Sequence, residues 1–137
     1  MRISLLALEG LFDTGLTVTL DVFTIANRIS AREMGGTPFF EVSIVGVRKR
    51  VRSGQGLAIP VRAVTPDLKP DWVIVPALST GMPEQLIRSL GRPEVTQAKA
   101  QLRKWYEEGV NIAASCIGTF ILAEAGLLDN SEATTTW

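Results

Sequence analysis

The sequence predicts an α/β protein, a three-layer sandwich in which helices cover both faces of a mostly parallel, flavodoxin-like sheet. Short apolar runs alternate with longer amphipathic segments along the chain, which is the pattern of parallel strands joined by helical crossovers. Two of these runs, Ile3–Leu8 and Trp72–Pro76, lack polar alternation, as expected of strands buried on both faces. With 137 residues the chain has room for one core, so we expect a single domain over residues 1–137.

The composition excludes several classes of protein. Basic and acidic residues number 14 each, and the resulting net charge of zero does not indicate binding to nucleic acid or to an anionic membrane. The single cysteine, Cys116, excludes an internal disulfide and a multi-cysteine metal site, and it fits a reducing cytoplasm. The chain has no histidine, which is the commonest metal ligand and catalytic base. We therefore predict a cytoplasmic protein without a metal or cofactor.

The first half of the chain predicts two strands, a helix and a small antiparallel excursion. The run Ile3–Leu8 is short and has no cleavage site after it, so it is typical of a strand rather than a signal peptide, and no run is long enough to span a bilayer. A second strand is expected over 39–47, and a Gly-rich turn between short apolar runs predicts the antiparallel excursion near 48–62. The helix is expected over 16–32, capped by Asp13 or Thr14. Two apolar rows should pack it over the sheet: Val18, Val22, Ile25 and Ile29, and Leu16, Leu20 and Phe23.

The second half predicts three more helices and two more strands besides Trp72–Pro76. One helix begins at Pro83, and the next runs from about Glu94 to Glu108 and ends at Gly109. Its buried face is expected to carry Ala98, Leu102, Trp105 and Tyr106. A strand over 110–114 leads into a last helix, and the β-branched run 133–137 predicts one more strand. Because the sequence stops inside that run, we expect a domain truncated at its C-terminal end.

Cys116 lies at the turn between the strand over 110–114 and the helix that follows. This places it at the carboxyl end of a buried strand, the edge at which open α/β sheets bind ligands. The start of a helix favours the thiolate, so the pKa of Cys116 is expected to fall. Ala114 and Gly118 have the small side chains that a sharp strand-to-helix turn needs. The alternative is that Cys116 is an ordinary small core residue.

The residues around this turn resemble a known family. The stretch from Cys116 to Asp129 reads C-x-G-x-F-x-L-A-x-A-G-L-L-D, and 133–137 reads A-T-T-x-W. Both resemble the ThiJ/PfpI superfamily, which has the class I glutamine amidotransferase-like fold, and within it the N-terminal domain of AraC-type (GlxA-like) transcription regulators. Leu20-Asp21-Val22-Phe23 with Ala26-Asn27 resembles the first-helix motif of these proteins. The resemblance implies a homodimer, and a helix-turn-helix domain beyond Trp137 that would bind the DNA.

Departures from the family pattern argue against catalysis. Enzymes of the superfamily pair the cysteine with a histidine from the next strand, but this chain carries Thr136 where many relatives carry that histidine. Threonine cannot act as a general base near neutral pH. The acids Glu9 and Asp13 do not match the spacing of the family's carboxylate, and Ala77-Leu78 replaces a frequent Gly-Gly pair. We therefore expect no catalytic residue, with Cys116 as the nucleophile if the protein is an enzyme after all.

Three hypotheses follow from these observations. The first is an effector-sensing and dimerisation domain that binds a small molecule without transforming it. Its expected pocket is lined by Cys116, Ile117, Asp13, Ala77, Leu78 and Thr136. Asp13 has the alternative role of helix cap, and Thr136 that of an ordinary strand residue. The second hypothesis is a cysteine-dependent hydrolase, hydratase or glyoxalase-like enzyme, and the third is redox sensing by Cys116.

Overall fold

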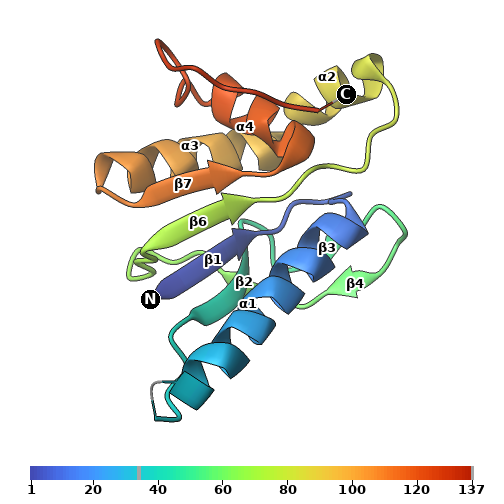
Figure 1. Ribbon diagram of the computed structural model, residues 1–137. Helices are drawn as coiled ribbons and strands as arrows, with labels where there is room; N and C mark the ends of the chain where they lie inside the picture. Colours follow the sequence, from blue (N-terminus) through green and yellow to red (C-terminus); the bar gives the residue numbers. More distant parts are fainter. Residues whose placement is uncertain (34, 137) are drawn as a thin grey trace.

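The computed structural model describes residues 1–33 and 35–136, and a parallel sheet lies at its centre (Figure 1). The strand order of this sheet is β5-β2-β1-β6-β7. The strands are β1 (Arg2–Leu6), β2 (Glu41–Gly46), β5 (Arg62–Ala63), β6 (Trp72–Val75) and β7 (Asn111–Ala114). Each neighbouring pair is parallel, and in the register Ile3 of β1 lies between Val42 of β2 and Trp72 of β6. The predicted α/β class and parallel sheet are confirmed.

The segment between β2 and β6 contains the predicted antiparallel excursion. Strands β3 (Val51–Arg52) and β4 (Ala58–Ile59) form a small antiparallel hairpin apart from the main sheet. The end of the predicted range differs, because Arg62 already belongs to β5 and pairs with Val45 at the edge of the main sheet.

Among the described helices, α1 (Asp13–Glu33) is the one that covers the first face of the sheet, and residues of the β3–β4 hairpin pack into the core cluster on that face (Figure 1). Leu16 is buried and Leu20 and Phe23 are partly buried, in a cluster with Ile3 and Leu5 of β1. The other predicted row does not pack on the sheet: Val18, Val22, Ile25 and Ile29 are between 52 and 57% exposed. These two rows lie on opposite sides of the helix, so a straight helix on a sheet buries only one of them.

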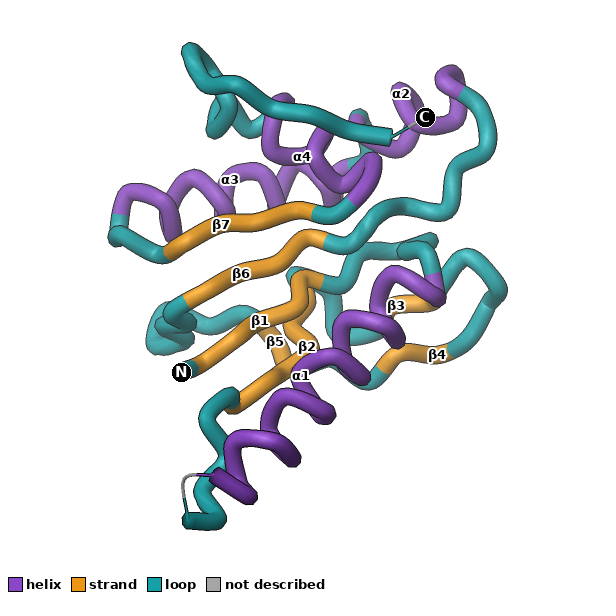
Figure 2. The backbone as a smooth tube through the Cα atoms, in the orientation of Figure 1, coloured by secondary structure: helices purple, strands orange, loops and turns teal. Residues whose placement is uncertain are grey.

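Three helices cover the opposite face, namely α2 (Pro83–Leu90), α3 (Pro93–Glu107) and α4 (Thr119–Glu124) (Figure 2). Their apolar side chains share a large core with Leu6, Val73 and Val75 of the sheet. Helix α3 ends as predicted before Gly109, which has a φ of +82°. Ala98, Leu102 and Trp105 are buried as expected, but Tyr106 is 58% exposed because it lies one position past the buried face.

The C-terminal segment 132–136 contains no strand, so the predicted strand over 133–137 is wrong for its described residues. Trp137, the last residue of that prediction, lies outside the described part of the chain, as does Met34. Instead of pairing with β7, the segment places Thr135 and Thr136 against Cys116 through side-chain hydrogen bonds. Among the described residues, no helix is both long and apolar enough to cross a membrane.

Candidate functional site

The candidate site lies at the carboxyl edge of the sheet, where β7 ends and turns into α4. Ser115 still donates its N–H to the Val75 carbonyl of β6 at 3.1 Å, so sheet pairing continues up to the turn. Residues Cys116–Gly118 then form a single 3-10 turn, and α4 follows without a break. The predicted strand–turn–helix arrangement around Cys116 is confirmed.

The backbone of the turn is strained at Cys116. Its φ of +53° is in the left-handed region, which costs a non-glycine residue about 1–2 kcal/mol. Gly118 explains how the turn fits: a Cβ at this position would lie 2.5 Å from the Val75 carbonyl oxygen and 3.0 Å from that of Pro76. The turn therefore presses directly on the end of β6, and the absence of a side chain at Gly118 allows it.

The thiol of Cys116 is exposed, and its partner is a hydroxyl group. The Sγ atom lies 2.8 Å from Oγ1 of Thr136. The backbone carbonyl of Cys116 accepts two further hydrogen bonds at 2.9 Å, from the hydroxyls of Thr119 and Thr135. Of the predicted pocket residues, the structure thus brings Cys116 and Thr136 into contact, and the C-terminal segment lies across the turn.

Asp13 has a different set of partners from Cys116. It is the first residue of α1, and its Oδ2 accepts a 3.1 Å hydrogen bond from the backbone N–H of Gln55 in the turn of the β3–β4 hairpin. Its Oδ1 is buried and has no hydrogen-bond partner among the described residues. The carboxylate therefore fastens the hairpin turn to the start of α1, and its hydrogen bonds go to a different segment from those of Cys116.

Ala77 and Leu78 follow β6 and are almost fully buried, with exposed fractions of 2% and 3%. The Ala77 carbonyl accepts the N–H of Phe12 at 2.8 Å, and Ser79 donates its N–H to Gly10 at 2.7 Å. These backbone bonds join the loop after β6 to the loop after β1. Ala77 and Leu78 therefore contribute hydrogen-bonded backbone at this edge of the sheet, and their side chains are buried.

Two cavities adjoin the turn. Ile117 is half-buried and lines a small one of about 80 Å³, together with Thr80, Gly81, Met82, Pro83 and Leu86. A larger one of about 290 Å³ lies between α4 and the C-terminal segment. It is lined by Thr119, Phe120, Ala123, Leu128, Ser131, Ala133, Thr134 and Thr135. Thr119 and Thr135 also bond to the Cys116 carbonyl, so this second cavity is continuous with the cysteine turn.

Sequence reasoning missed the larger cavity because it treated 133–137 as a strand. The available signal was the spacing of Phe120 and Ala123 in the predicted helix, three residues apart and therefore on one face. A volume of about 290 Å³ is at the lower end of the range for small-molecule pockets. No cluster of metal-ligating side chains occurs among the described residues.

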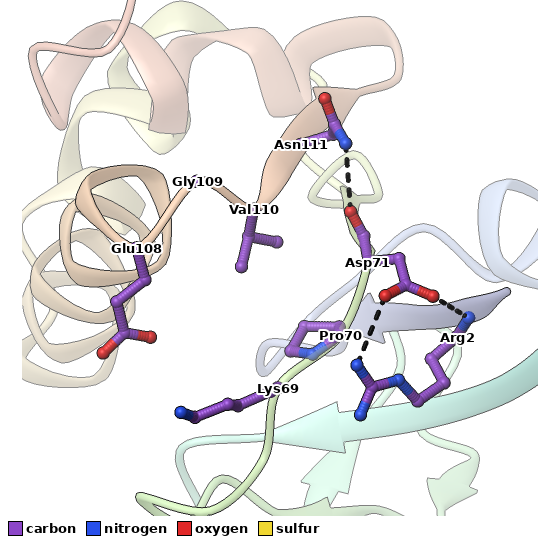
Figure 3. Close-up of a pocket in the computed structure, with 8 residues that line it drawn as sticks. All are labelled: Arg2, Lys69, Pro70, Asp71, Glu108, Gly109, Val110 and Asn111. Carbon is purple, nitrogen blue, oxygen red and sulfur yellow. Dashed lines mark hydrogen bonds and ion pairs between the residues drawn. The ribbon is translucent and has the colours of Figure 1, made fainter.

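A third cavity, of about 510 Å³, opens at the amino edge of the sheet, away from Cys116 (Figure 3). Asp71 is one of its lining residues, and its carboxylate accepts hydrogen bonds from the backbone N–H of Arg2 at 2.6 Å and from the Arg2 guanidinium at 3.3 Å. These two bonds lower the pKa of Asp71. Asn111 donates to the Asp71 backbone carbonyl at 3.2 Å. Arg2 and Asp71 are thus paired with each other, and together with Asn111 they link the starts of β1, β6 and β7.

Comparison with solved structures identifies the fold. An AraC family transcriptional regulator from Pseudomonas putida superimposes with a TM-score of 0.68 at 22% identity, over 97% of this chain and 75% of that one. Drosophila melanogaster DJ-1beta gives 0.61 at 20% identity, over 91% and 60%. Oxidized Toxoplasma gondii DJ-1 gives 0.62 at 18%, over 98% and 66%. No protein-family model and no curated sequence matches.

The chain therefore has the DJ-1/ThiJ/PfpI-like fold, which confirms the fold that the cysteine-turn motif implied. Within that fold, AraC family transcriptional regulators are among its most similar structures. The chain spans 60 to 75% of the length of the three structures compared.

Proposed function

We propose that this chain is the effector-sensing and dimerisation domain of an AraC-type transcription regulator, and that it binds a small molecule without transforming it. The similarity in fold to the Pseudomonas putida regulator supports this proposal, as do the motifs from Cys116 to Trp137. DNA binding is assigned to a helix-turn-helix domain outside the sequence, in keeping with the zero net charge of this part. We also propose that this regulator acts in the cytoplasm.

The contact between Cys116 and Thr136 carries the non-catalytic part of the proposal. A nucleophilic cysteine in an acyl-transfer enzyme needs a neighbouring base to remove its proton. Here the neighbour at 2.8 Å is a hydroxyl group, which does not take up a proton near neutral pH. The Asp13 carboxylate is not the base in this proposal: its Oδ2 accepts a hydrogen bond from the hairpin turn, and among the described residues neither of its oxygens is hydrogen-bonded to Cys116.

The ligand is proposed to bind at the carboxyl edge of the sheet, in contact with the cysteine turn. The predicted residues there are Cys116, Ile117, Asp13, Ala77, Leu78 and Thr136. The cavity beside α4 supports this location, because it shares Thr119 and Thr135 with the turn and has an apolar wall at Phe120 and Ala123. A small molecule with an apolar group is the ligand class that such a wall accommodates.

A cysteine-dependent enzyme is the alternative, and the strained φ of Cys116 favours it, because backbone strain occurs frequently at active sites. The test compares the wild-type chain with Cys116→Ser on amide, isonitrile and dicarbonyl substrates. Our proposal expects the same background rate from both proteins. Turnover that depends on Cys116 at ordinary enzymatic rates would establish the enzyme and overturn the sensor.

Installing the missing base sharpens the same test. Thr136→His is expected to raise the rate of Cys116 alkylation by iodoacetamide at pH 7 about tenfold, because an adjacent imidazolium stabilises the thiolate. Thr135→His is the matched control, since the Thr135 hydroxyl bonds to the backbone carbonyl and not to the sulfur. Equal rates for wild type and Thr136→His would show that Thr136 does not occupy the position of a base.

A further inference from the structure

The cavity of about 510 Å³ at the amino edge of the sheet is lined by two charged side chains besides the Arg2–Asp71 pair. Among the described residues, the Lys69 ammonium has no hydrogen-bond or ion-pair partner. The Glu108 carboxylate lies 3.9 Å from the Lys104 ammonium, and both of these side chains are about half exposed. An exposed pair of this kind contributes little, so Glu108 remains able to bind a cation. The cavity therefore offers one positive and one negative group to a ligand.

These two groups come from different elements and meet at one side of the cavity. Lys69 precedes β6, and Glu108 follows the last residue of α3. Figure 3 shows their charged ends on the same side of the view, away from the Arg2–Asp71 pair. Among the described residues they form no ion pair with each other, so the space between them is open. A small molecule that has both a carboxylate and an ammonium group is complementary to this arrangement.

The end of α3 gives a second reason to place the ammonium group beside Glu108. Glu108 is the C-terminal cap of this 15-residue helix, whose last carbonyl groups carry partial negative charge. Gly109 follows and also lines the cavity. A Cβ at Gly109 would meet nothing within 4 Å, so the space beside the helix end is open to a ligand. The Glu108 carboxylate and the helix end therefore both favour a cation at this point.

A neighbouring cavity of about 330 Å³ continues from the first one through Gly109, Val110 and Asn111, which line both. Its other lining residues are apolar or aromatic: Trp72, Tyr106, Ile112, Leu122, Leu127 and Leu128. Trp72 and Tyr106 are 38% and 58% exposed, so their rings are available to a ligand. This second cavity accommodates an apolar group that is attached to the charged end of the same molecule.

We propose that the two cavities together form a binding site for a free α-amino acid with an apolar side chain, of which leucine is the example tested below. Its carboxylate binds to Lys69, and its ammonium group binds to Glu108 and the end of α3. Its side chain enters the second cavity beside Trp72 and Tyr106. The site is at the opposite edge of the sheet from Cys116, so the inference goes beyond the proposed function and does not rest on it.

The experiment is a titration of the 137-residue chain with L-leucine, followed by amide NMR. Binding is expected with a dissociation constant on the order of 1 mM, because the charged contacts are exposed. The signals of Lys69, Gly109 and Asn111 should shift, and those of the turn at Cys116 should not. Glycine, isocaproate and isoamylamine each lack one of the three recognised groups, and each should bind at least about tenfold more weakly.

Three results of this titration would overturn the inference. The first is a leucine titration that shifts no signal. The second is a set of shifts centred on the turn at Cys116, which would place the amino acid at the other edge of the sheet. The third is equal affinity for leucine and glycine, which would mean that the second cavity takes no side chain of the ligand.

Substitutions test which side chain binds which charge of the ligand. Lys69→Gln should weaken leucine binding about tenfold and leave isoamylamine binding unchanged, because isoamylamine has no carboxylate. Glu108→Gln should weaken leucine binding to a similar extent and leave isocaproate binding unchanged, because isocaproate has no ammonium group. Lys49→Gln and Glu107→Gln are the matched controls, since both residues are exposed and lie outside the two cavities. If Lys69→Gln or Glu108→Gln binds leucine as tightly as the controls do, the inference is overturned.

Tyr106→Ala tests the second cavity. The ring is exposed, so the variant is expected to fold, and it should reduce the preference for leucine over glycine by about threefold. Ile87→Ala is the matched control, because Ile87 is 68% exposed on α2 and lines neither cavity. A preference that Tyr106→Ala leaves unchanged contradicts the placement of the ligand side chain. The alkylation and turnover assays at Cys116 do not depend on any of these results.

Discussion

The two helical layers differ sharply in how completely they are packed. Helix α3 has 15 residues and buries five side chains, including Trp105 and Glu94. Helix α1 has 21 residues, and Leu16 is its one fully buried side chain among the described residues. Of the four described α-helices, the longest therefore has the fewest buried side chains. The difference indicates that the α2–α3–α4 layer supplies most of the stability of the isolated chain, whereas the α1 layer has surface left for an association.

Removing a buried side chain from the α2–α3–α4 layer is expected to lower the free energy of unfolding most. Trp105→Ala should lower the free energy of unfolding by about 3–5 kcal/mol, because it leaves a large cavity and removes the bond from the indole N–H to the Leu68 carbonyl. Tyr106→Ala, one residue further on, should cost no more than about 0.5 kcal/mol, since that ring is exposed. Urea denaturation measures both, and equal losses would contradict the assignment of the buried face.

The two sides of α1 should respond differently to the same kind of truncation. Leu16→Ala is expected to cost about 2–5 kcal/mol, because Leu16 is buried against the sheet. Val18→Ala should change the free energy of unfolding by no more than about 0.5 kcal/mol, because Val18 is exposed on the other side of the helix. Urea denaturation at low protein concentration measures both free energies of unfolding. A large loss for Val18→Ala would show that the row of Val18, Val22, Ile25 and Ile29 is part of the core.

A smaller effect is expected at the contact between the cysteine turn and the sheet. Gly118→Ala should cost about 1–3 kcal/mol, because its Cβ would collide with the Val75 carbonyl oxygen. Gly91→Ala is the matched control: its Cβ would meet nothing closer than 3.7 Å, and its φ of −82° suits alanine. Thermal unfolding of the two variants makes the comparison. If Gly118→Ala has the same melting temperature as the wild type, the turn is not in close contact with the end of β6.

Periodicity and turn residues were sufficient to predict most of the fold. The parallel strands, the hairpin near 48–62 and the end of α3 at Gly109 each follow from a local signal. Burial patterns fixed by tertiary contacts did not follow. Both apolar rows of α1 satisfied the helical period, and only the position of the sheet decides that Leu16 faces inward and Val22 outward. Tyr106 lies beside a buried position in the sequence, and that is not enough to bury it.

The candidate site was predictable in its centre and not in its surroundings. The small residues around Cys116 indicated a sharp turn, and the structure contains it. The segment 133–136 has strand-forming residues, but its threonine hydroxyls bond to the turn in place of backbone pairing with β7. The cavity beside α4 depends on that path and was therefore missed. The hydrogen bond from the Gln55 N–H to the Asp13 carboxylate joins residues 42 positions apart, which no local sequence pattern can predict.

The loops that carry the site are joined mainly through their peptide groups. Phe12 bonds to Ala77, Ser79 to Gly10, and Gly54 to Leu11, in each case from N–H to carbonyl. Main-chain links of this kind persist when the side chains around them are exchanged. A platform made this way can acquire new ligand preferences by substitution at its rim while its shape is inherited unchanged, in keeping with a shared architecture at close to one identical residue in five.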